Sequence, residues 1–150
     1  RRQRQMCIRD RYMASGNVVF LLHLDLVKGV ARDQVGIRFL KTNIGINGII
    51  STHANLIQFA RKEGLATIQR LFIIDSESLK KGTNLVQNCR PDGVEILPGM
   101  ILSHITEEIR HINFPPVVAG GIIKTKQDVL TVLQSGAIAV STSRKELWRL

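Results

Sequence analysis

Short apolar runs alternate with amphipathic segments along most of the chain, and this alternation limits its fold more than any other feature. Each of six runs has the length of a β-strand, and the segments between them show the apolar spacing typical of helices. The runs cover residues 18–26, 48–51, 66–71, 93–97, 116–119 and 137–141. This order predicts successive βα units with right-handed crossovers and one parallel sheet.

Several of the segments between the runs carry residues that start or end helices. Thr52 is placed to cap one helix and Gly64 to end it. Thr125 and Asp128 form a variant of the capping pattern at the start of another, which Gly136 closes. A third helix is expected over 100–112, and weaker helical patterns cover 33–41 and 76–88.

The alternation of side chains within the strands distinguishes two arrangements of such a sheet. In an open doubly wound sheet helices cover both faces, so each strand is continuously apolar. Here His23 and Asp25 share one face of the first run, and Glu95 alternates with Val94 and Ile96 in the fourth. A polar or small inner face and an apolar outer face favour a barrel.

The length of the chain is short for such a barrel. A (β/α)8 barrel has eight strands and at least roughly 200 residues, whereas this chain has 150 residues and six strand-like runs. We therefore expect a TIM-like (β/α)8 barrel that is truncated at the N-terminus, with about six βα units present. A single partial barrel domain is expected over residues 15–150.

Positive charge is concentrated at the start of the sequence. The formal net charge is +9, but residues 1–14 contain five of the 21 lysines and arginines and one of the 12 acids. Such a segment could be a basic arm for RNA or DNA. We interpret it instead as a disordered or non-native start, which leaves a mildly basic domain of 16 cations and 11 acids.

Several classes of protein are disfavoured by composition. No stretch approaches 18 uninterrupted apolar residues, and no signal-peptide pattern is visible, so we expect neither a membrane span nor secretion. Cys7 and Cys89 are too few for a disulfide scaffold and lack the spacing of metal ligands. These features predict a cytoplasmic protein without a metal centre.

Two loops at the last strands predict a phosphate site. In barrels of this kind the loops after strands 7 and 8 bind phosphate, because glycine lets backbone N–H groups approach an anion. Gly120 and Gly121 supply that approach, Ser141 and Thr142 supply hydroxyl and amide donors, and Lys124 is placed to neutralise charge. The alternative is that the glycine pair only forms a tight turn.

A second group of polar residues lies near the C-terminal ends of the earlier strands, where barrels bind their ligands. A histidine and a carboxylate on one face suit a general base and its orienting partner, or hydrogen-bonding partners for a polyol. Each of these residues, taken singly, could also be a buried polar residue whose hydrogen bonds are made within the protein. The group comprises His23, Asp25, Lys28, Ser51, Gln69, Arg70 and Glu95.

Six short blocks of residues lie in register along the chain, from about residue 19 to the C-terminus and without large gaps. The blocks are His23-Leu-Asp-Leu-Val-Lys-Gly29, Gly48-Ile-Ile-Ser-Thr52, Ala66-Thr-Ile-Gln-Arg70 with Asp75-Ser76, Glu95-Ile-Leu-Pro-Gly99, Ala119-Gly-Gly-Ile-Ile-Lys124 and Ala139-Val-Ser-Thr-Ser143 with Lys145-Glu-Leu-Trp148. Together these blocks resemble the glycerol-3-phosphate responsive antiterminator family. Family members open with two further βα units, which residues 1–14 do not contain.

The resemblance implies a cytoplasmic bacterial regulator of glycerol use and not an enzyme. Its effector would be glycerol 3-phosphate, its partner leader mRNA, and it would need no cofactor; the oligomeric state stays open. By position, the two late loops would hold the phosphate, with Lys124 nearby. Asp25, Gln69 and Glu95 would receive glycerol hydroxyls. His23, Lys28 and Arg70 would line the rim.

Two functions remain open at this point. The first is a ligand-gated RNA-binding regulator whose basic side chains contact the RNA backbone, with Arg61, Lys62, Lys80, Lys81, Arg144, Lys145 and Arg149 as candidates. The second is a phosphosugar isomerase or epimerase on the same scaffold, because one fold hosts many functions. His23 with Asp25 and Glu95 keeps isomerisation open, whereas no strand-borne lysine is present for an aldolase.

Overall fold

The computed structural model describes residues 19–148, which form one parallel sheet flanked by helices. The strands lie in the sheet in the order in which they occur in the sequence, and every pair is parallel. They are β1 (Leu21–His23), β2 (Gly48–Ser51), β3 (Ala66–Phe72), β4 (Gly93–Leu97), β5 (Val117–Gly120) and β6 (Ala139–Ser141). The predicted parallel sheet of six consecutive strands is confirmed.

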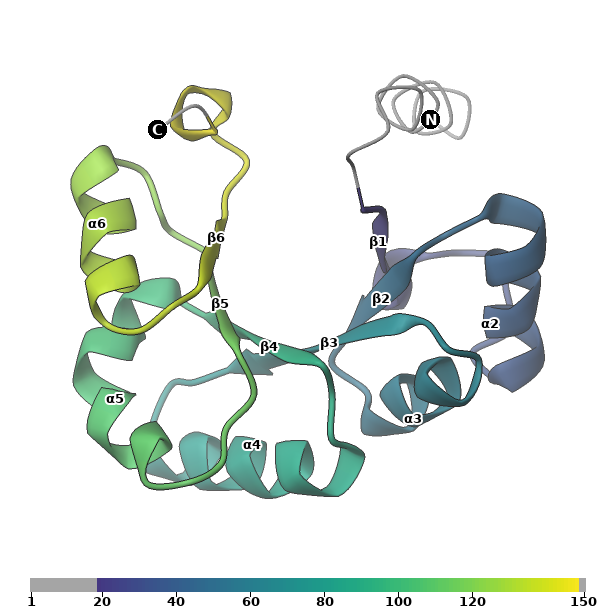
Figure 1. Cartoon of the computed structure of the whole chain (residues 1–150), viewed down its shortest axis with the longest axis horizontal. Helices are drawn as coiled ribbons and strands as arrows, with labels where there is room; N and C mark the ends of the chain where they lie inside the picture. The colour runs from purple at the N-terminus through teal and green to yellow at the C-terminus, as the bar shows by residue number, and fades with distance from the viewer. Residues whose placement is uncertain (1–18, 149–150) are drawn as a thin grey trace.

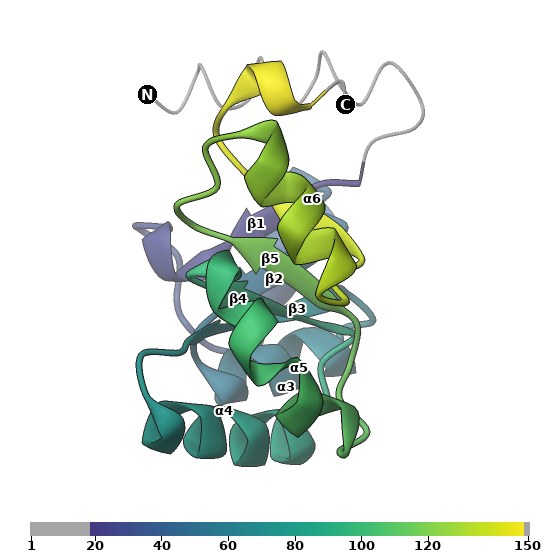
Figure 2. The same ribbon diagram turned by 90° about the vertical axis from the view of Figure 1, so that its left-hand side faces the viewer.

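All five α-helices of the described residues cover the same, convex face of this curved sheet (Figure 1; the view in Figure 2 is turned by 90°). They are α2 (Gln34–Phe39), α3 (Ala54–Lys62), α4 (Ser76–Cys89), α5 (Leu102–Arg110) and α6 (Lys126–Gln134). A doubly wound sheet would carry helices on both faces. Over the described residues the fold is therefore a half-barrel of six parallel strands, with no α-helix on its inner face.

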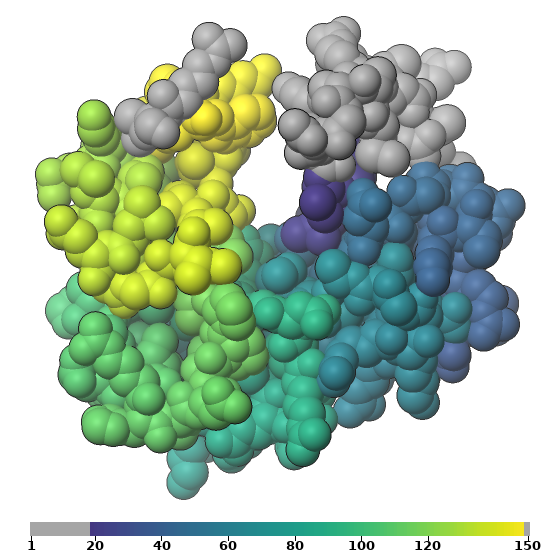
Figure 3. Space-filling view, viewed as in Figure 1, coloured from purple at the N-terminus to yellow at the C-terminus, as the bar shows by residue number. Residues whose placement is uncertain are grey.

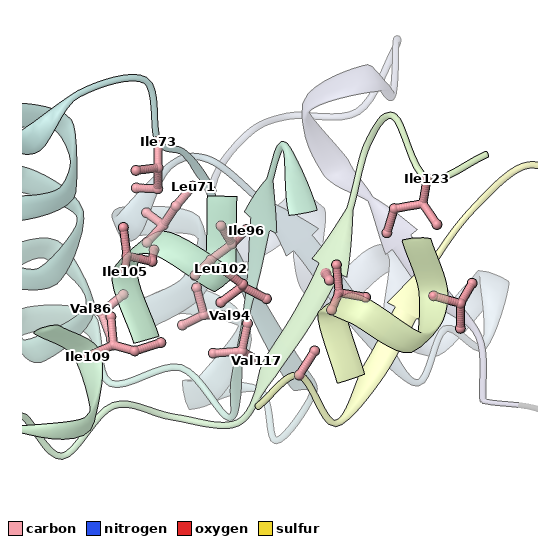
Figure 4. Packing of buried hydrophobic residues seen from close by; sticks show 14 residues of the cluster. Leu71, Ile73, Val86, Val94, Ile96, Leu102, Ile105, Ile109, Val117 and Ile123 are labelled. Atoms are coloured by element: carbon pink, nitrogen blue, oxygen red, sulfur yellow. The ribbon is translucent and has the colours of Figure 1, made fainter. Parts of the chain in front are cut away.

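The apolar core lies between the sheet and the helices. Val94 and Ile96 of β4 pack with Leu102 and Ile105 of α5 in one cluster of buried side chains (Figure 4). A second cluster joins β2 to α2 and α3. Because side chains alternate across a strand, burial of Val94 and Ile96 under the helices directs Glu95 to the inner face, as the sequence predicts.

Helix ends confirm most of the predicted caps and correct one. Thr125 and Asp128 form a reciprocal capping box at the start of α6, and Gly64 follows α3 with a φ of +69°. The cap of α3, however, is His53 and not Thr52. The Thr52 hydroxyl instead donates to Asp25 Oδ2 at 2.8 Å, so an interaction with the first strand's loop replaces the predicted cap.

The first strand is shorter than the predicted run of 18–26. After His23 the chain enters a 3₁₀ turn, η1 (Leu24–Leu26), with Leu24 buried in the second core cluster. The carboxylate of Asp25 accepts hydrogen bonds from β2 and its loop, which holds this turn against the neighbouring strand. Residue 18 of the predicted run and the whole segment 1–14 lie outside the described residues.

The remaining helix bounds differ from prediction by a few residues. Asp33 caps α2, and the helix continues as a π-helical turn, η2 (Leu40–Ile44). A 3₁₀ turn, η3 (Gly99–Ile101), precedes α5, and η4 (Lys145–Leu147) follows β6. No helix in the described part of the chain combines the length and the apolar character that crossing a membrane needs.

Within residues 19–148 the sheet is open at β1 and β6, each of which pairs with only one strand of this range. Figure 3 shows the molecule hollowed between these two sides. The helices nearest the two edges also leave apolar side chains exposed, namely Val35 and Phe39 on α2 and Leu130 and Leu133 on α6. Ile138, just before β6, is 67% exposed.

Candidate functional site

The inner face of the half-barrel has a cavity of about 220 Å³ at the C-terminal ends of the later strands. Its walls come from β3, β4 and the loops that follow β5 and β6. The lining residues are Arg70, Glu95, Leu97, Gly121, Ile122, Ile123, Ser141, Thr142 and Ser143. The structure thus brings both predicted phosphate loops together with two members of the predicted polar group.

A larger cavity of about 470 Å³ lies at the other end of the strands, beside the end of α5 and the start of β5. Residues such as His111, Pro116 and Ile138 line it. Parallel α/β folds bind their ligands at the C-terminal ends of the strands. We therefore place the candidate site in the smaller cavity.

One end of the candidate cavity is an ion pair between neighbouring strands. Arg70 and Glu95 are direct partners in the register of β3 and β4. Arg70 Nε donates to Glu95 Oε2 at 2.6 Å, and the two side chains are only 18% and 3% exposed. Arg70 Nη1 also lies 3.2 Å from Nδ1 of His23. The predicted His23, Arg70 and Glu95 therefore form one contact network across β1, β3 and β4.

The chain passes close to this ion pair at the end of β5, because the last residue of the strand and the residue after it are both glycine. A Cβ atom on Gly120 would lie 2.7 Å from Glu95 Oε1, and one on Gly121 would lie 3.2 Å from Leu97 Cδ2. Gly121 also has a φ of +72°, a region that favours glycine. Both predicted glycines are thus required by the backbone path beside the cavity.

Hydrogen bonds tie the loop after β6 to the loop after β5. The Thr142 hydroxyl donates to the Ile123 carbonyl at 3.1 Å and accepts from the Arg144 backbone N–H at 3.2 Å. Trp148 Nε1 donates to the Thr142 carbonyl at 2.9 Å. Ser141 lies beside Gly120 in the strand register. Thr142 thereby fixes the two loops to each other, and Ser141 is one of the residues that line the cavity.

Asp25 is held by residues of the neighbouring strand end. Its carboxylate accepts from Ser51 Oγ at 2.5 Å and from the Thr52 amide and hydroxyl at 2.8 Å each. Desolvation raises the pKa of Asp25, but these hydrogen bonds outweigh it and hold the pKa below its usual value. His23 Nε2 lies 3.6 Å from Oδ2. Asp25 therefore orders the rim from which His23 reaches Arg70.

Two members of the predicted polar group do not point into the barrel. Gln69 is fully buried on the helix side of β3, where its Nε2 donates to the Thr52 carbonyl and its Oε1 accepts from Cys89 Sγ. Ser51 is fully buried on the face of β2 that Ile49 shares. The physical reason is strand alternation: Gln69 precedes Arg70, so their side chains take opposite faces.

The two predicted lysines lie outside the cavity wall. Lys28 and Lys124 are both exposed, and neither lines the cavity. The backbone N–H of Lys124 donates to Asp128 Oδ2 at 2.9 Å, so this residue is part of the α6 cap. Sequence reasoning missed Leu97, Ile122, Ile123 and Ser143 as wall residues. Of these, Ser143 was signalled by its place directly after the Ser141-Thr142 pair.

Ile122 carries backbone strain beside the cavity. Its φ is +57° and its residue surface is 68% exposed. A β-branched residue in this region is unusual and costs about 1–3 kcal/mol. We predict that Ile122→Asn, which tolerates this backbone, raises the free energy of unfolding by about 1 kcal/mol in urea denaturation. Ile138→Asn is the matched control, because Ile138 is equally exposed without a positive φ; an equal gain there would contradict the explanation.

Comparison with known proteins identifies the family. The model of the glycerol-3-phosphate responsive antiterminator family matches residues 7–148. The chain belongs to this family. A glycerol uptake operon antiterminator regulatory protein from Listeria monocytogenes is 45% identical and superposes with a TM-score of 0.82, over 93% of this chain and 75% of that one. The resemblance found in the sequence is therefore confirmed.

Other antiterminator-like relatives agree with this assignment. A glycerol uptake operon antiterminator-related protein from Thermotoga maritima is 25% identical, with a TM-score of 0.83 over 97% of this chain and 81% of that one. The Escherichia coli protein YgcP is 38% identical over 139 residues, which are 91% of this chain and 70% of that protein. Membership of the antiterminator family supports a regulatory role in glycerol uptake.

Enzymes share the fold at much lower identity. N-acetylneuraminate lyase from Mycoplasma synoviae is 14% identical and has a TM-score of 0.60, over 87% of this chain and 54% of that one. At this identity the likeness shows a TIM-barrel-like fold alone, and nothing about activity follows from it.

Proposed function

We propose that this antiterminator-family protein binds glycerol 3-phosphate in the cavity between the β5 and β6 loops and, when loaded, binds leader mRNA of glycerol-utilisation operons. The observation that carries the proposal is that one cavity joins a glycine loop suited to phosphate to a buried carboxylate suited to hydroxyl groups. The protein would act in the cytoplasm, without a catalytic step and without a cofactor.

The phosphate would lie against the loops after β5 and β6. Gly120 and Gly121 leave room for an anion to reach backbone N–H groups, and Ser141 offers a hydroxyl donor. Thr142 would contribute by holding the loops at a fixed separation. Lys124 would add positive charge at longer range, since it is exposed outside the cavity wall.

The glycerol part would extend toward the inner ion pair. Glu95 presents a carboxylate that can accept hydrogen bonds from hydroxyl groups, and Arg70 holds that carboxylate in place. His23 would border the ligand through its contact with Arg70. Asp25 would act on the ligand through the rim, because its oxygens already accept three hydrogen bonds.

Two further strands would complete the barrel between β6 and β1. Neither edge strand has an outer partner among the described residues, and the helices next to them expose apolar side chains. Unpaired edges and exposed apolar patches are unfavourable unless another element covers them. A (β/α)8 barrel needs eight strands, so two more βα units would satisfy both edges.

Regulation requires that the ligand favour the RNA-binding state by free energy, because equal binding to two states shifts no equilibrium. The ligand would contact the β5 and β6 loops together, which are linked through Thr142. Exposed basic residues for the RNA backbone lie on α3, on α4 and after β6, namely Arg61, Lys62, Lys80, Lys81, Arg144 and Lys145. Arg149, the remaining candidate, lies outside the described residues.

The contacts of Asp25 and His23 do not suit these two residues to act as the general base of an isomerase. A general base needs an oxygen or nitrogen free to take a proton from substrate. Asp25 accepts three hydrogen bonds and both ring nitrogens of His23 lie within 3.3 Å of Arg70 Nη1. These residues are arranged to hold a ligand and each other.

Isothermal titration calorimetry tests the ligand. Glycerol 3-phosphate is expected to bind at least about tenfold tighter than inorganic phosphate, and glycerol alone is expected to bind weakest, because the charged end makes the strongest hydrogen bonds. Ser141→Ala should lower the affinity for glycerol 3-phosphate. Ser103→Ala, which lies on α5 and outside the cavity, should leave that affinity unchanged. Equal binding of glycerol and glycerol 3-phosphate would contradict the proposed site.

A further inference from the structure

The inner end of the cavity contains a carboxylate oxygen with no partner. Glu95 is 2% exposed, and its Oε2 is taken by Arg70 Nε, but none of the described residues donates to Oε1. No fully enclosed side-chain oxygen or nitrogen among the described residues lacks a partner, so Oε1 keeps its contact with the open cavity. A nearly buried acceptor of this kind is stabilised by a ligand that brings a donor.

The charge at this end of the cavity is already balanced. The Arg70 guanidinium pairs with Glu95 at 2.6 Å and reaches the His23 ring with another nitrogen. The ion pair as a whole carries no net charge. Toward the cavity it therefore offers an acceptor oxygen and no uncompensated cation that could bind a second anion.

We propose that Glu95 determines ligand specificity: it selects phosphomonoesters whose far end is a neutral alcohol and rejects those whose far end is a carboxylate or a second phosphate. This inference rests on the phosphate site proposed above. An alcohol O–H donates to Glu95 Oε1, whereas a carboxylate has no proton to donate and is repelled by the like charge. Arg70 weakens that repulsion, because the pair as a whole is neutral, but the pair supplies no net positive charge to attract the ligand carboxylate.

Removal of the Glu95 charge should then weaken the preference for the alcohol over the acid. In Glu95→Gln the side chain keeps its shape but no longer neutralises Arg70. The freed guanidinium is suited to a ligand carboxylate through charge-assisted hydrogen bonds. The same substitution replaces a charged acceptor for the alcohol with a neutral one. Affinity for a phosphorylated acid should rise while affinity for a phosphorylated alcohol falls.

Calorimetric titrations of the full chain with two matched ligands test this inference. Glycerol 3-phosphate and 3-phosphoglycerate share the phosphate and the carbon chain and differ in one terminal group, an alcohol against a carboxylate. The unmodified protein should bind the alcohol about 100-fold tighter than the acid. Glu95→Gln should reduce this ratio at least about tenfold. Glu63→Gln, a glutamate at the end of α3 that also pairs with an arginine, should leave the ratio unchanged.

The outcomes separate this inference from the proposed function. If the unmodified protein binds neither inorganic phosphate nor glycerol 3-phosphate, both fail. If it binds glycerol 3-phosphate but binds the acid equally well, or if folded Glu95→Gln keeps the original ratio, only the specificity role of Glu95 is overturned. If Glu95→Gln does not fold, the double variant Arg70→Gln/Glu95→Gln replaces it, because it removes both charges. The ratio of its affinities for glycerol 3-phosphate and 3-phosphoglycerate should approach one. An unchanged ratio in that variant overturns the inference as well.

Discussion

Replacement of Arg70 by methionine is expected to lower the free energy of unfolding by about 3 kcal/mol and to abolish measurable binding of glycerol 3-phosphate. Methionine keeps much of the side-chain volume but leaves Glu95 as a nearly buried charge without its guanidinium partner. Loss of one partner from a buried ion pair is among the most destabilising single changes, at about 3–5 kcal/mol. Urea denaturation followed by circular dichroism measures the first effect, and calorimetry measures the second.

Arg38→Met is the matched control for this prediction. Arg38 also pairs with a glutamate, Glu63, at 2.9 Å, but its side chain is 60% exposed on α2. Water screens such a pair, so its loss should change stability little and leave ligand binding intact. If Arg70→Met is no more destabilising than Arg38→Met, the inner ion pair is not the structural centre of the site.

Gly120→Ala is expected to have the next largest effect, a loss of about 1–3 kcal/mol in stability with at least tenfold weaker ligand binding. The added methyl group would lie 2.7 Å from Glu95 Oε1, and Glu95 cannot move freely because Arg70 holds it. The same methyl group would narrow the approach to the backbone N–H groups after β5. Urea denaturation and calorimetric titration are again the measurements.

A double-mutant cycle distinguishes this collision from a general intolerance of alanine. In Gly120→Ala/Glu95→Ala the carboxylate that the methyl group would meet is absent. The stability loss of the double variant should therefore be clearly smaller than the sum of the two single losses. Additive losses would show that the clash with Glu95 is not the cause.

The strand alternation made most of the fold and half of the site predictable. In β4 the apolar Val94 and Ile96 flank Glu95. Burial of these two side chains under the helices places the Glu95 carboxylate on the opposite, inner face of the sheet. The same reasoning on the whole chain indicated a barrel and not a doubly wound sheet. The late loops were predictable because Gly120 and Gly121 follow a strand directly and strand order places them beside Ser141.

Other parts of the site could not be found from single residues. Gln69 and Arg70 are both polar neighbours near a strand end, and only the register of β3 shows that Arg70 faces inward while Gln69 joins Cys89 under the helices. Ile122 gave no signal, because a β-branched residue is the least expected one at positive φ. Asp25 appeared as a ligand contact, yet its three hydrogen bonds make it a support for the rim.

The proposed control of RNA binding by the ligand is tested most directly by a filter-binding titration. Leader RNA of a glycerol-utilisation operon is titrated with the protein at fixed salt, with and without saturating glycerol 3-phosphate, and Gly120→Ala serves as the ligand-binding control. We predict that the ligand tightens RNA binding by about 5- to 150-fold, that the variant loses this response, and that affinity falls as salt rises. Equal RNA affinity with and without the ligand in the unmodified protein would contradict the account.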